Sequence, residues 1–391
     1  MSDQLLLKRS NSKLNYFILI TVIIAAGLSQ GLLLPVLSIL LEQKGVSSSL
    51  NGLNAAALYV GSFAMTLVAE RVLGAIGFKR LIAAGISLVL VTLLLFPLLP
   101  GIKVWFILRL LVGIGDSAIN YAAQLWVLLM APAEHRGRNL SLYGMSYGLG
   151  FSLGPAGISL LRFGEAAPFL ILAGLFMLAL LLVLFKLPNS RPDKVEHSEG
   201  QARRFGRSYS LAWYALIPAL LYGYMEASLN SNFPVYGLRS GFTTDQIATL
   251  LPFAGIGGLL LQLPLGLWSD EYGRKKILIF AGTAGGLAFT LLPLAGGHFV
   301  FTLLLLLAAG GLVGSFFSLG LSYAADILPR NLLPAANVVS SFHFSIGSII
   351  GPGIGGLLLE FGWGSGVFVL LGGFYILFGL TGLLFSPQQM N

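Results

Sequence analysis

Residues 109–157 decide the fold of this chain: they begin RLLVGIGD (109–116), cross the basic turn EHRGR (134–138) and end in GFSLGPAG (150–157). Arg109 and Asp116 lie inside an apolar run, where ionisable side chains are costly and indicate function. The glycines at 150, 154 and 157 allow helices to approach closely, and Pro155 removes one internal hydrogen bond. The stretch therefore predicts two membrane helices, one carrying chemistry and one able to flex.

The composition excludes several classes of protein. Of the 391 residues, 56% are hydrophobic and 10% are charged, against about 25% charged in a soluble domain. There is no cysteine, and the four histidines lack metal-ligand spacing, so we expect no disulfide, no metal and no cofactor. The net charge of +8 lies mostly in turns between apolar runs, which argues against nucleic acid as a partner. Most of the surface is predicted to face lipid.

Twelve apolar runs are long enough to cross a bilayer. They lack the alternation of a barrel, so all are predicted to be helices. The first run follows a charged N-terminus but is too long for a signal peptide, so we expect an uncleaved span. The predicted spans are 14–41, 50–73, 79–99, 103–130, 139–161, 166–187, 210–236, 245–268, 276–295, 299–326, 334–360 and 364–386.

The distribution of Lys and Arg predicts the orientation. With the N-terminus inside, eighteen of these residues lie on the cytoplasmic side and four outside. This strong bias predicts that both termini are cytoplasmic.

The chain divides into two similar halves. Residues 188–209 are too polar to span a membrane, so we expect two six-helix bundles, 1–187 and 210–391, joined by a cytoplasmic linker. Gly150 and Gly347 are 197 residues apart, as are the Gly-Pro pairs at 154 and 351. The sequence therefore predicts an all-α membrane protein of twelve transmembrane helices in two pseudo-symmetric halves, with a substrate site at the midplane between them.

Three motifs resemble those of the major facilitator superfamily. The turn GLWSDEYGRKK (266–276) is similar to the family's signature cytoplasmic loop, and Arg109-x-x-x-Gly113-x-Gly115 resembles its span-4 motif. Gly150-x-x-x-Gly154-Pro155-x-Gly157 resembles the span-5 motif of proton-coupled exporters. Within the family, the layout is most similar to the bacterial twelve-span drug:proton antiporters.

The resemblance implies a cytoplasmic gate and flexing helices. The gate residues would be Glu70, Lys79, Arg80, Arg136, Arg138, Asp270, Gly273, Arg274 and Lys275. The flexing positions would be Gly150, Gly154, Pro155, Gly347, Gly351 and Pro352. One feature departs from the family: Gly74 stands where Asp270 stands in the second half, so Glu70 is a candidate substitute for the missing gating carboxylate.

Two deep carboxylates are the candidates for coupling to protons. Arg109, Gly113, Asp116, Asn120 and Gln124 share one face of span 4. Tyr222, Glu226 and Asn230 share one face of span 7. Because Arg109 can offset the charge of Asp116, we expect Asp116 to stay ionised and Glu226 to carry the proton or anchor a cationic cargo. Arg109 could instead bond carbonyls of neighbouring helices.

Further polar side chains within spans are weaker candidates for the substrate cavity. They are Gln30, Asn54, Tyr59, Ser315, Ser318, Ser322, Asp326, Asn337 and His343. Of these, the three serines and Asp326 share one face of the span 299–326. His343 is more typical of a hydrogen bond between helices than of a ligand.

These patterns favour a proton-coupled secondary exporter of small amphipathic or cationic compounds. Its partners would be the small-molecule substrate, protons and membrane lipids. We expect a monomer in the bacterial cytoplasmic membrane and no enzymatic activity. Two alternatives are a proton-symport importer of a small nutrient and a transporter of lipid or lipid-linked cargo.

Overall fold

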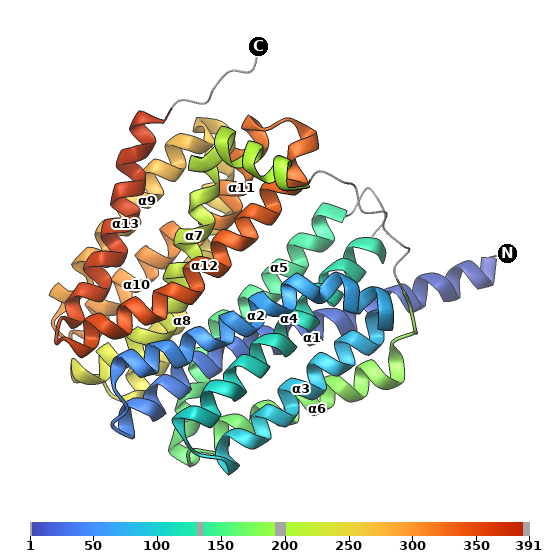
Figure 1. Ribbon diagram of the computed structural model, residues 1–391, viewed down its shortest axis with the longest axis horizontal. Coiled ribbons are helices and arrows are strands. Elements are labelled where there is room, and N and C mark those ends of the chain that lie inside the picture. Colours follow the sequence, from blue (N-terminus) through green and yellow to red (C-terminus); the bar gives the residue numbers. More distant parts are fainter. Residues whose placement is uncertain (1, 131–135, 192–200, 386–391) are drawn as a thin grey trace. The chain divides into compact units, whose positions relative to one another are not determined.

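The computed structural model describes residues 2–130, 136–191 and 201–385; side chains are not described for 2–13, 136–138, 140, 141, 201–204 and 330. These residues form α-helices joined by short turns and 3₁₀ segments, and none of them lies in a strand (Figure 1). The helices are α1 (Ser2–Gln43), α2 (Ser48–Ile76), α3 (Phe78–Leu98), α4 (Ile102–Met130), α5 (Arg136–Leu153), α6 (Ala167–Lys186), α7 (Gln201–Arg239), α8 (Thr244–Tyr272), α9 (Arg274–Leu291), α10 (Phe299–Val313), α11 (Phe316–Ile327), α12 (Leu333–Glu360) and α13 (Gly364–Leu384). The expectation of an all-helical chain is confirmed for this part of the sequence.

Within the described ranges, nine helical segments are long and apolar enough to cross a membrane. They comprise α1 from Leu14, α2, α3, α6, α8, α9 with its 3₁₀ extension, the joined α10 and α11, α12 and α13. The helices that do not qualify are α4, α5 and α7. Two of these carry the predicted ionisable residues: Arg109 and Asp116 lie on α4, and Glu226 lies on α7.

The chain forms two compact units, one of Met1–Val36 with Ala57–Val195 and the other of Leu37–Ala56 with Glu196–Asn391. In the first unit, glycines bring helix backbones together in pairs. A Cβ at Gly31 of α1 would lie 2.2 Å from the Phe151 carbonyl of α5, and one at Gly61 of α2 would lie 2.0 Å from the Leu110 carbonyl of α4. Helix α3 packs against both α4 and α6.

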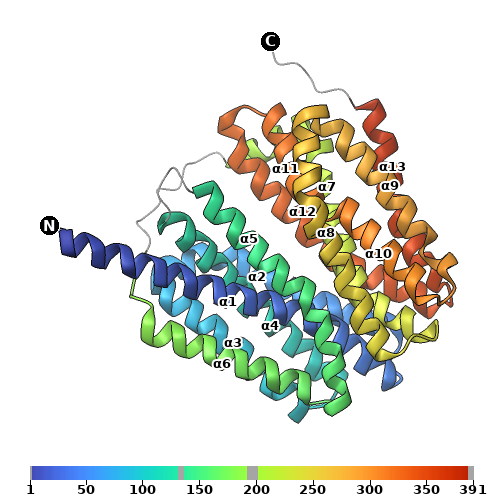
Figure 2. The ribbon, with the colours of Figure 1, turned by 180° about the vertical axis from the view of Figure 1, so that it is seen from behind.

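The second unit has a matching set of helix pairs. Helix α7 lies along α12, and a Cβ at Gly347 would lie 2.1 Å from the Leu220 carbonyl (Figures 1 and 2). A Cβ at Gly310 of α10 would lie 2.1 Å from the Ala254 carbonyl of α8, and α9 packs against α10 and α13. In each unit the interfaces therefore use small residues, as is usual for helices in a membrane.

Three predicted spans differ in detail from the structure. Span 299–326 is not one helix, because α10 ends at Val313 and α11 begins at Phe316. Span 139–161 changes at Gly154-Pro155 from α5 to a ten-residue 3₁₀ helix, η2 (Gly154–Phe163). Span 210–236 is part of a longer helix, because α7 begins at Gln201 and is kinked at Ala212, where φ is −132°. Residues 201–209, predicted to be linker, thus form a separate helical segment.

The loops before α3 and α9 have the same backbone feature. Gly77 and Gly273 directly precede these helices and have φ values of +85° and +96°. Side chains other than glycine are disfavoured at such angles. The two turns therefore depend on glycine at equivalent places in the sequence repeat.

Candidate functional site

The first half of α4, around Arg109 and Gly113, has its polar face buried. Arg109 has no exposed surface, and its Nη2 donates a 3.4 Å hydrogen bond to the Leu34 carbonyl of α1. Tyr59 of α2 interacts with it electrostatically. Gly113, one turn on, packs directly on the α2 backbone, where a Cβ would lie 1.8 Å from the Leu58 carbonyl. This part of α4 is therefore held against α1 and α2, as the alternative interpretation of Arg109 predicts.

Asp116 lies two turns after Arg109 and is 4% exposed. Neither of its carboxylate oxygens has a hydrogen-bond partner among the described residues. No ion pair joins it to Arg109 in that part of the chain, so the expected compensation of its charge is not seen. A buried polar group without a partner needs an explanation, and a role in function is one.

Beyond Asp116 the face becomes more open and more hydrogen-bonded. Asn120 Nδ2 donates to the Asp116 carbonyl at 3.2 Å, and Tyr143 of α5 donates to Asn120 Oδ1 at 3.0 Å. Gln124 is exposed. From α5, Tyr147 also donates to Gln30 of α1. The structure thus brings four predicted site residues, Asp116, Asn120, Gln124 and Gln30, onto α4 and the helices next to it.

The polar face of α7 forms the corresponding site in the second unit. Glu226 is 7% exposed, and the Tyr222 side chain hydrogen-bonds its carboxylate. Asn230 Nδ2 donates to the Glu226 carbonyl at 2.9 Å. The Tyr222 ring stacks on Phe344 of α12 with centroids 6.0 Å apart. Glu226 therefore has a hydrogen-bond donor and an aromatic surface beside it.

The weaker candidates lie in several environments. His343 Nδ1 contacts the Leu216 carbonyl across the α7–α12 interface at 3.1 Å, so a hydrogen bond between helices is confirmed there. Ser315 is buried at the start of α11, its hydroxyl without a described partner, whereas Ser318 is exposed. Tyr59 and Asn54 are buried on α2, and both amide atoms of Asn54 lack a described partner. No ligand requirement follows from these residues alone.

The predicted gate in the second half is a cluster of three charges. Arg274 bonds Asp270 with its Nη2 at 3.1 Å and Asp326 of α11 with its Nε at 3.0 Å. Lys275 donates to the Phe385 carbonyl, and Gly273 forms the turn. Asp326 was not among the predicted gate residues, although it lies on the polar face of its span.

The described residues of the first half form no such cluster. The repeat places Gly74, Phe78 and Leu129 where Asp270, Arg274 and Asp326 stand. Phe78 instead stacks on Trp126 of α4, with ring centroids 5.2 Å apart. Glu70 is exposed near Tyr121 of α4 and forms no ion pair with described residues. An aromatic contact thus occupies the position of the charge cluster.

The other predicted gate residues differ in how far they are described. Arg136 and Arg138 begin α5, but their side chains lie outside the described part of the structure. Lys79 and Arg80 begin α3 and line a cavity. The roles of all these residues in gating stay predictions.

The glycine-proline motifs are equivalent in sequence but differ in backbone. At Gly154-Pro155 the helix changes to 3₁₀, and a Cβ on Gly154 would lie 2.6 Å from the Gly31 backbone. At Gly351-Pro352 the α12 helix continues, and a Cβ on Gly351 would lie 2.7 Å from the Tyr224 carbonyl. A 3₁₀ segment within a span often marks a hinge. Flexing is therefore better supported for Gly154 than for Gly351, while Gly150 and Gly347 serve close packing.

The sequence analysis missed a group of hydrogen bonds around Arg239, at the end of α7. Arg239 donates to both carboxylate oxygens of Glu42, at 2.8 and 3.1 Å, to the Leu359 carbonyl at 2.8 Å and to Ser48 Oγ at 2.7 Å. Glu360 accepts a 2.9 Å hydrogen bond from the Ser49 amide nearby. Glu42 and Arg239 are 197 residues apart, which is the repeat offset, so the repeat places them at equivalent span ends.

Removing the Glu42–Arg239 pair is expected to destabilise the second unit modestly. Arg239 is 42% exposed, so solvent screens the pair. A double-mutant cycle of Glu42→Gln and Arg239→Gln should give a coupling of about 0.2–1 kcal/mol in thermal unfolding. Arg239→Lys should lose more stability than this coupling energy. Lysine cannot make the bidentate contact with Glu42 and at the same time the hydrogen bonds to the Leu359 carbonyl and Ser48. Equal stability of Arg239→Lys and the wild type would contradict this account.

Comparison with known proteins identifies the family. The Major Facilitator Superfamily model matches residues 19–260 and 208–389. An uncharacterized MFS-type transporter of Bacillus subtilis, YfkF, is 41% identical over 352 residues, which cover 89% of this chain and 90% of that protein. Multidrug resistance protein 2 of the same organism is 24% identical over 363 residues, and the match covers 90% of this chain and 90% of that protein.

Solved structures share the fold. The nucleoside transporter NupG superposes with a TM-score of 0.75 at 16% identity, and the match covers 95% of this chain and 98% of that one. A bacterial homologue of the human lysosomal transporter Spinster gives a TM-score of 0.71 at 14% identity, with 96% and 99% covered. With the family model matching both parts of the chain, this protein belongs to the major facilitator superfamily.

Proposed function

We propose that the chain is a proton-coupled secondary exporter of small amphipathic or cationic organic compounds that works by alternating access. The observation that carries this proposal is the buried carboxylate of Glu226 in the second unit, which the Tyr222 side chain hydrogen-bonds. Among the described residues, Arg109, Asp116 and Glu226 are the only buried side chains of ionisable acid or base type other than tyrosine. Charged groups at membrane depth are retained where ions or substrates move.

Membership of the superfamily makes the chain a multi-pass membrane transporter and not an enzyme. Its substrate is a small molecule. The direction of transport and the coupling ion belong to the proposal. They are supported by the Gly150–Gly157 motif, which resembles that of proton-coupled exporters, and by the 24% identity to a multidrug resistance protein.

The surroundings of Glu226 favour a cation as cargo. Its carboxylate supplies one negative charge, and the Tyr222–Phe344 stack supplies aromatic faces within the same unit. Phe317 meets Phe344 edge-on with centroids 6.1 Å apart, which extends that aromatic surface. A delocalised organic cation is attracted both by the carboxylate and by the ring faces. A neutral polar solute would use few of these contacts.

The topology follows from the same reasoning. We infer twelve spans: the nine apolar helical segments together with α4, α5 with η2, and α7. Their matching helix pairs support two pseudo-symmetric six-helix halves. The Lys and Arg bias supports cytoplasmic termini in the bacterial cytoplasmic membrane. The transporter is proposed to act as a monomer.

Inside-out membrane vesicles test the function. A pH gradient, acid inside, is imposed, and uptake of radiolabelled tetraphenylphosphonium is compared with that of uridine and of a lysophospholipid. The exporter should accumulate the cation severalfold and lose the accumulation when the gradient is collapsed. Gradient-driven uridine uptake in right-side-out vesicles would instead assign a nutrient symporter. Gradient-independent movement of the lysophospholipid would assign lipid cargo.

A further inference from the structure

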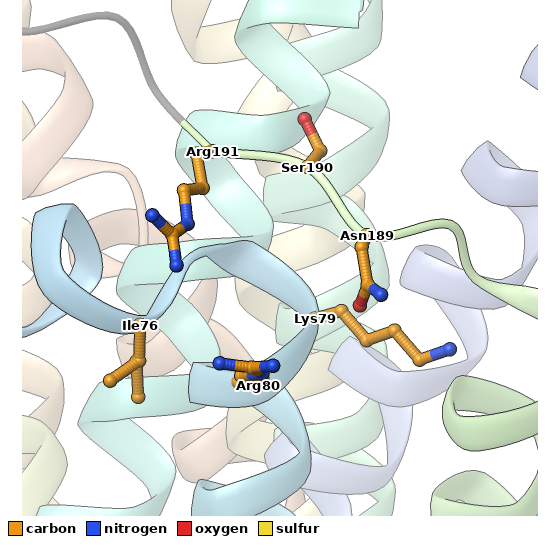
Figure 3. A pocket seen from close by; sticks show the side chains of 6 residues that line it. All are labelled: Ile76, Lys79, Arg80, Asn189, Ser190 and Arg191. Carbon is orange, nitrogen blue, oxygen red and sulfur yellow. The ribbon is translucent and has the colours of Figure 1, made fainter.

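An open cavity of about 320 Å³ lies at the turn between α2 and α3, within the first unit. Its lining is Ile76, Lys79, Arg80, Asn189, Ser190 and Arg191. The last three residues form a strap after α6, fixed by a 3.0 Å hydrogen bond from the Phe78 amide to the Ser190 carbonyl. Figure 3 shows Arg191 directed from the strap toward the α2–α3 turn, whereas the Lys79 side chain extends away from that turn.

The three cationic side chains of this cavity form no ion pair with the part of the protein that the structure describes. No described carboxylate forms an ion pair with Lys79, Arg80 or Arg191. Lys79 and Arg80 also lie in the first turn of α3, where the helix dipole is positive and cations are disfavoured. The cavity is therefore a concentration of positive charge that no described carboxylate neutralises.

The equivalent turn in the second unit provides an internal comparison. There Arg274 is paired with Asp270 and Asp326, and Lys275 donates to the Phe385 carbonyl. The first unit has lost both acidic positions and keeps its cations around a cavity. A ligand that brings its own negative charge would supply the missing partner.

We propose that this cavity binds a phosphate group, that of an anionic lipid headgroup or of a free phosphate ester. Guanidinium groups form bidentate hydrogen bonds to phosphate, and amides at a helix N-terminus point toward an anion. Asn189 and Ser190 also line the cavity from the strap, and Figure 3 shows the Asn189 amide directed toward Lys79. The ligand lies at the cytoplasmic surface of the membrane, given the proposed topology, and the lining includes none of the transport residues on α4 and α7.

The surface beside the cavity favours lipid over free phosphate. At the end of α6, directly before the strap, Leu184 and Phe185 are 45% and 78% exposed. Exposed apolar side chains next to a cluster of cations match the two parts of a phospholipid. A free phosphate ester would use only the polar part.

Lipid retention by the purified protein tests the proposal. The full-length protein is exchanged into detergent with phosphatidylglycerol, phosphatidylcholine or inorganic phosphate, and bound molecules are counted by native mass spectrometry. Phosphatidylglycerol should be retained over phosphatidylcholine. Arg191→Gln should weaken its binding about fivefold, and the triple variant K79Q/R80Q/R191Q more than tenfold. Lys276→Gln, which removes one charge from the matching turn of the second unit, should leave binding unchanged.

A second pair of variants tests the shape of the cavity without altering charge. A Cβ at Gly77 would lie 2.7 Å from the Ser190 carbonyl and 3.1 Å from Arg191 Cγ, and φ is +85°. Gly77→Ala should therefore displace the strap and weaken binding. Gly74→Ala, three residues earlier, meets nothing within 4 Å and should not.

The outcomes separate the two sources and decide the proposal. Preferential retention of phosphatidylglycerol that is lost in the triple variant supports a lipid site. Binding of inorganic phosphate with the same variant dependence, and no lipid preference, supports a free phosphate ester. Equal binding by the wild type, the triple variant and Gly77→Ala overturns the site. Because binding is read without transport, this result is independent of the proposed export activity.

Discussion

Replacing Glu226 with glutamine is expected to abolish transport against a substrate gradient while leaving the protein folded. Glutamine has the size and hydrogen-bonding shape of the protonated acid but cannot release a proton. In the structure, the Tyr222 side chain contacts the Glu226 carboxylate, so the site can stabilise the charged form as well as hold the neutral one. A proton carrier must accept both forms in turn. Accumulation driven by a pH gradient should fall at least tenfold in Glu226→Gln vesicles.

Asp116→Asn is the matched comparison. Asp116 is buried like Glu226, but neither of its oxygens has a described hydrogen-bond partner that would stabilise a charge. A neutral amide of the same size should therefore be tolerated, and gradient-driven accumulation should stay within about a factor of three of wild type. Both variants should elute as single peaks in size-exclusion chromatography. The opposite ranking, with Asp116→Asn inactive and Glu226→Gln active, would move the coupling site to α4.

The comparison shows what the sequence could and could not predict about the site. The sequence identifies Asp116 and Glu226 as the deep carboxylates, and both are buried in the structure. It predicts that Arg109 offsets the charge of Asp116, because the two share a helix face. Arg109 instead donates to the Leu34 carbonyl. Helical spacing gives the face of a residue, whereas the contact depends on a neighbouring helix that the spacing does not specify.

The fold was predictable at the level of helices and less so within them. Length and hydropathy locate the spans, since a bilayer requires about 20 apolar residues. The break between α10 and α11 falls at Gly314 and Ser315 within an unbroken apolar run, so hydropathy gives no signal there. The 3₁₀ segment after Leu153 begins at Gly154-Pro155, which the sequence does mark. Both repeats carry that motif, but the backbone changes at only one of the two.

Contacts between segments far apart in the chain were the part of the structure that the sequence predicted least. Glu42 and Arg239 lie near the ends of predicted spans and are 197 residues apart, which is the offset of the sequence repeat. Their pairing could be predicted only by comparing equivalent positions of the two repeats for opposite charge. The cavity beside α3 combines Lys79 and Arg80 with a strap from beyond α6. Nothing in the sequence places residues 189–191 on that turn, because the hydrogen bond from Phe78 to Ser190 joins segments over a hundred residues apart.

Adding one methyl group at Gly113 is expected to disrupt the first unit. A Cβ there would lie 1.8 Å from the Leu58 carbonyl oxygen and 2.9 Å from the Ser62 amide nitrogen. Both are backbone atoms of α2, so relief requires the two helices to separate. Overpacking of this kind costs about 1–3 kcal/mol, and separation also removes the close contact at Gly61. Gly113→Ala should lower the thermal midpoint and the monodisperse yield in fluorescence-detected size-exclusion chromatography.

Gly174→Ala on α6 controls for the substitution itself, because a Cβ at that position meets nothing within 4 Å. Alanine is favoured over glycine inside a helix by about 0.5–1 kcal/mol, so this variant should be as stable as the wild type or more so. The same chemical change should therefore shift stability in opposite directions at the two sites. Gly310→Ala, whose Cβ would lie 2.1 Å from the Ala254 carbonyl, should behave like Gly113→Ala, because α8 and α10 pack as α2 and α4 do. A loss at Gly113 without a loss at Gly310 would show that the two interfaces, although alike in geometry, do not bear equally on folding.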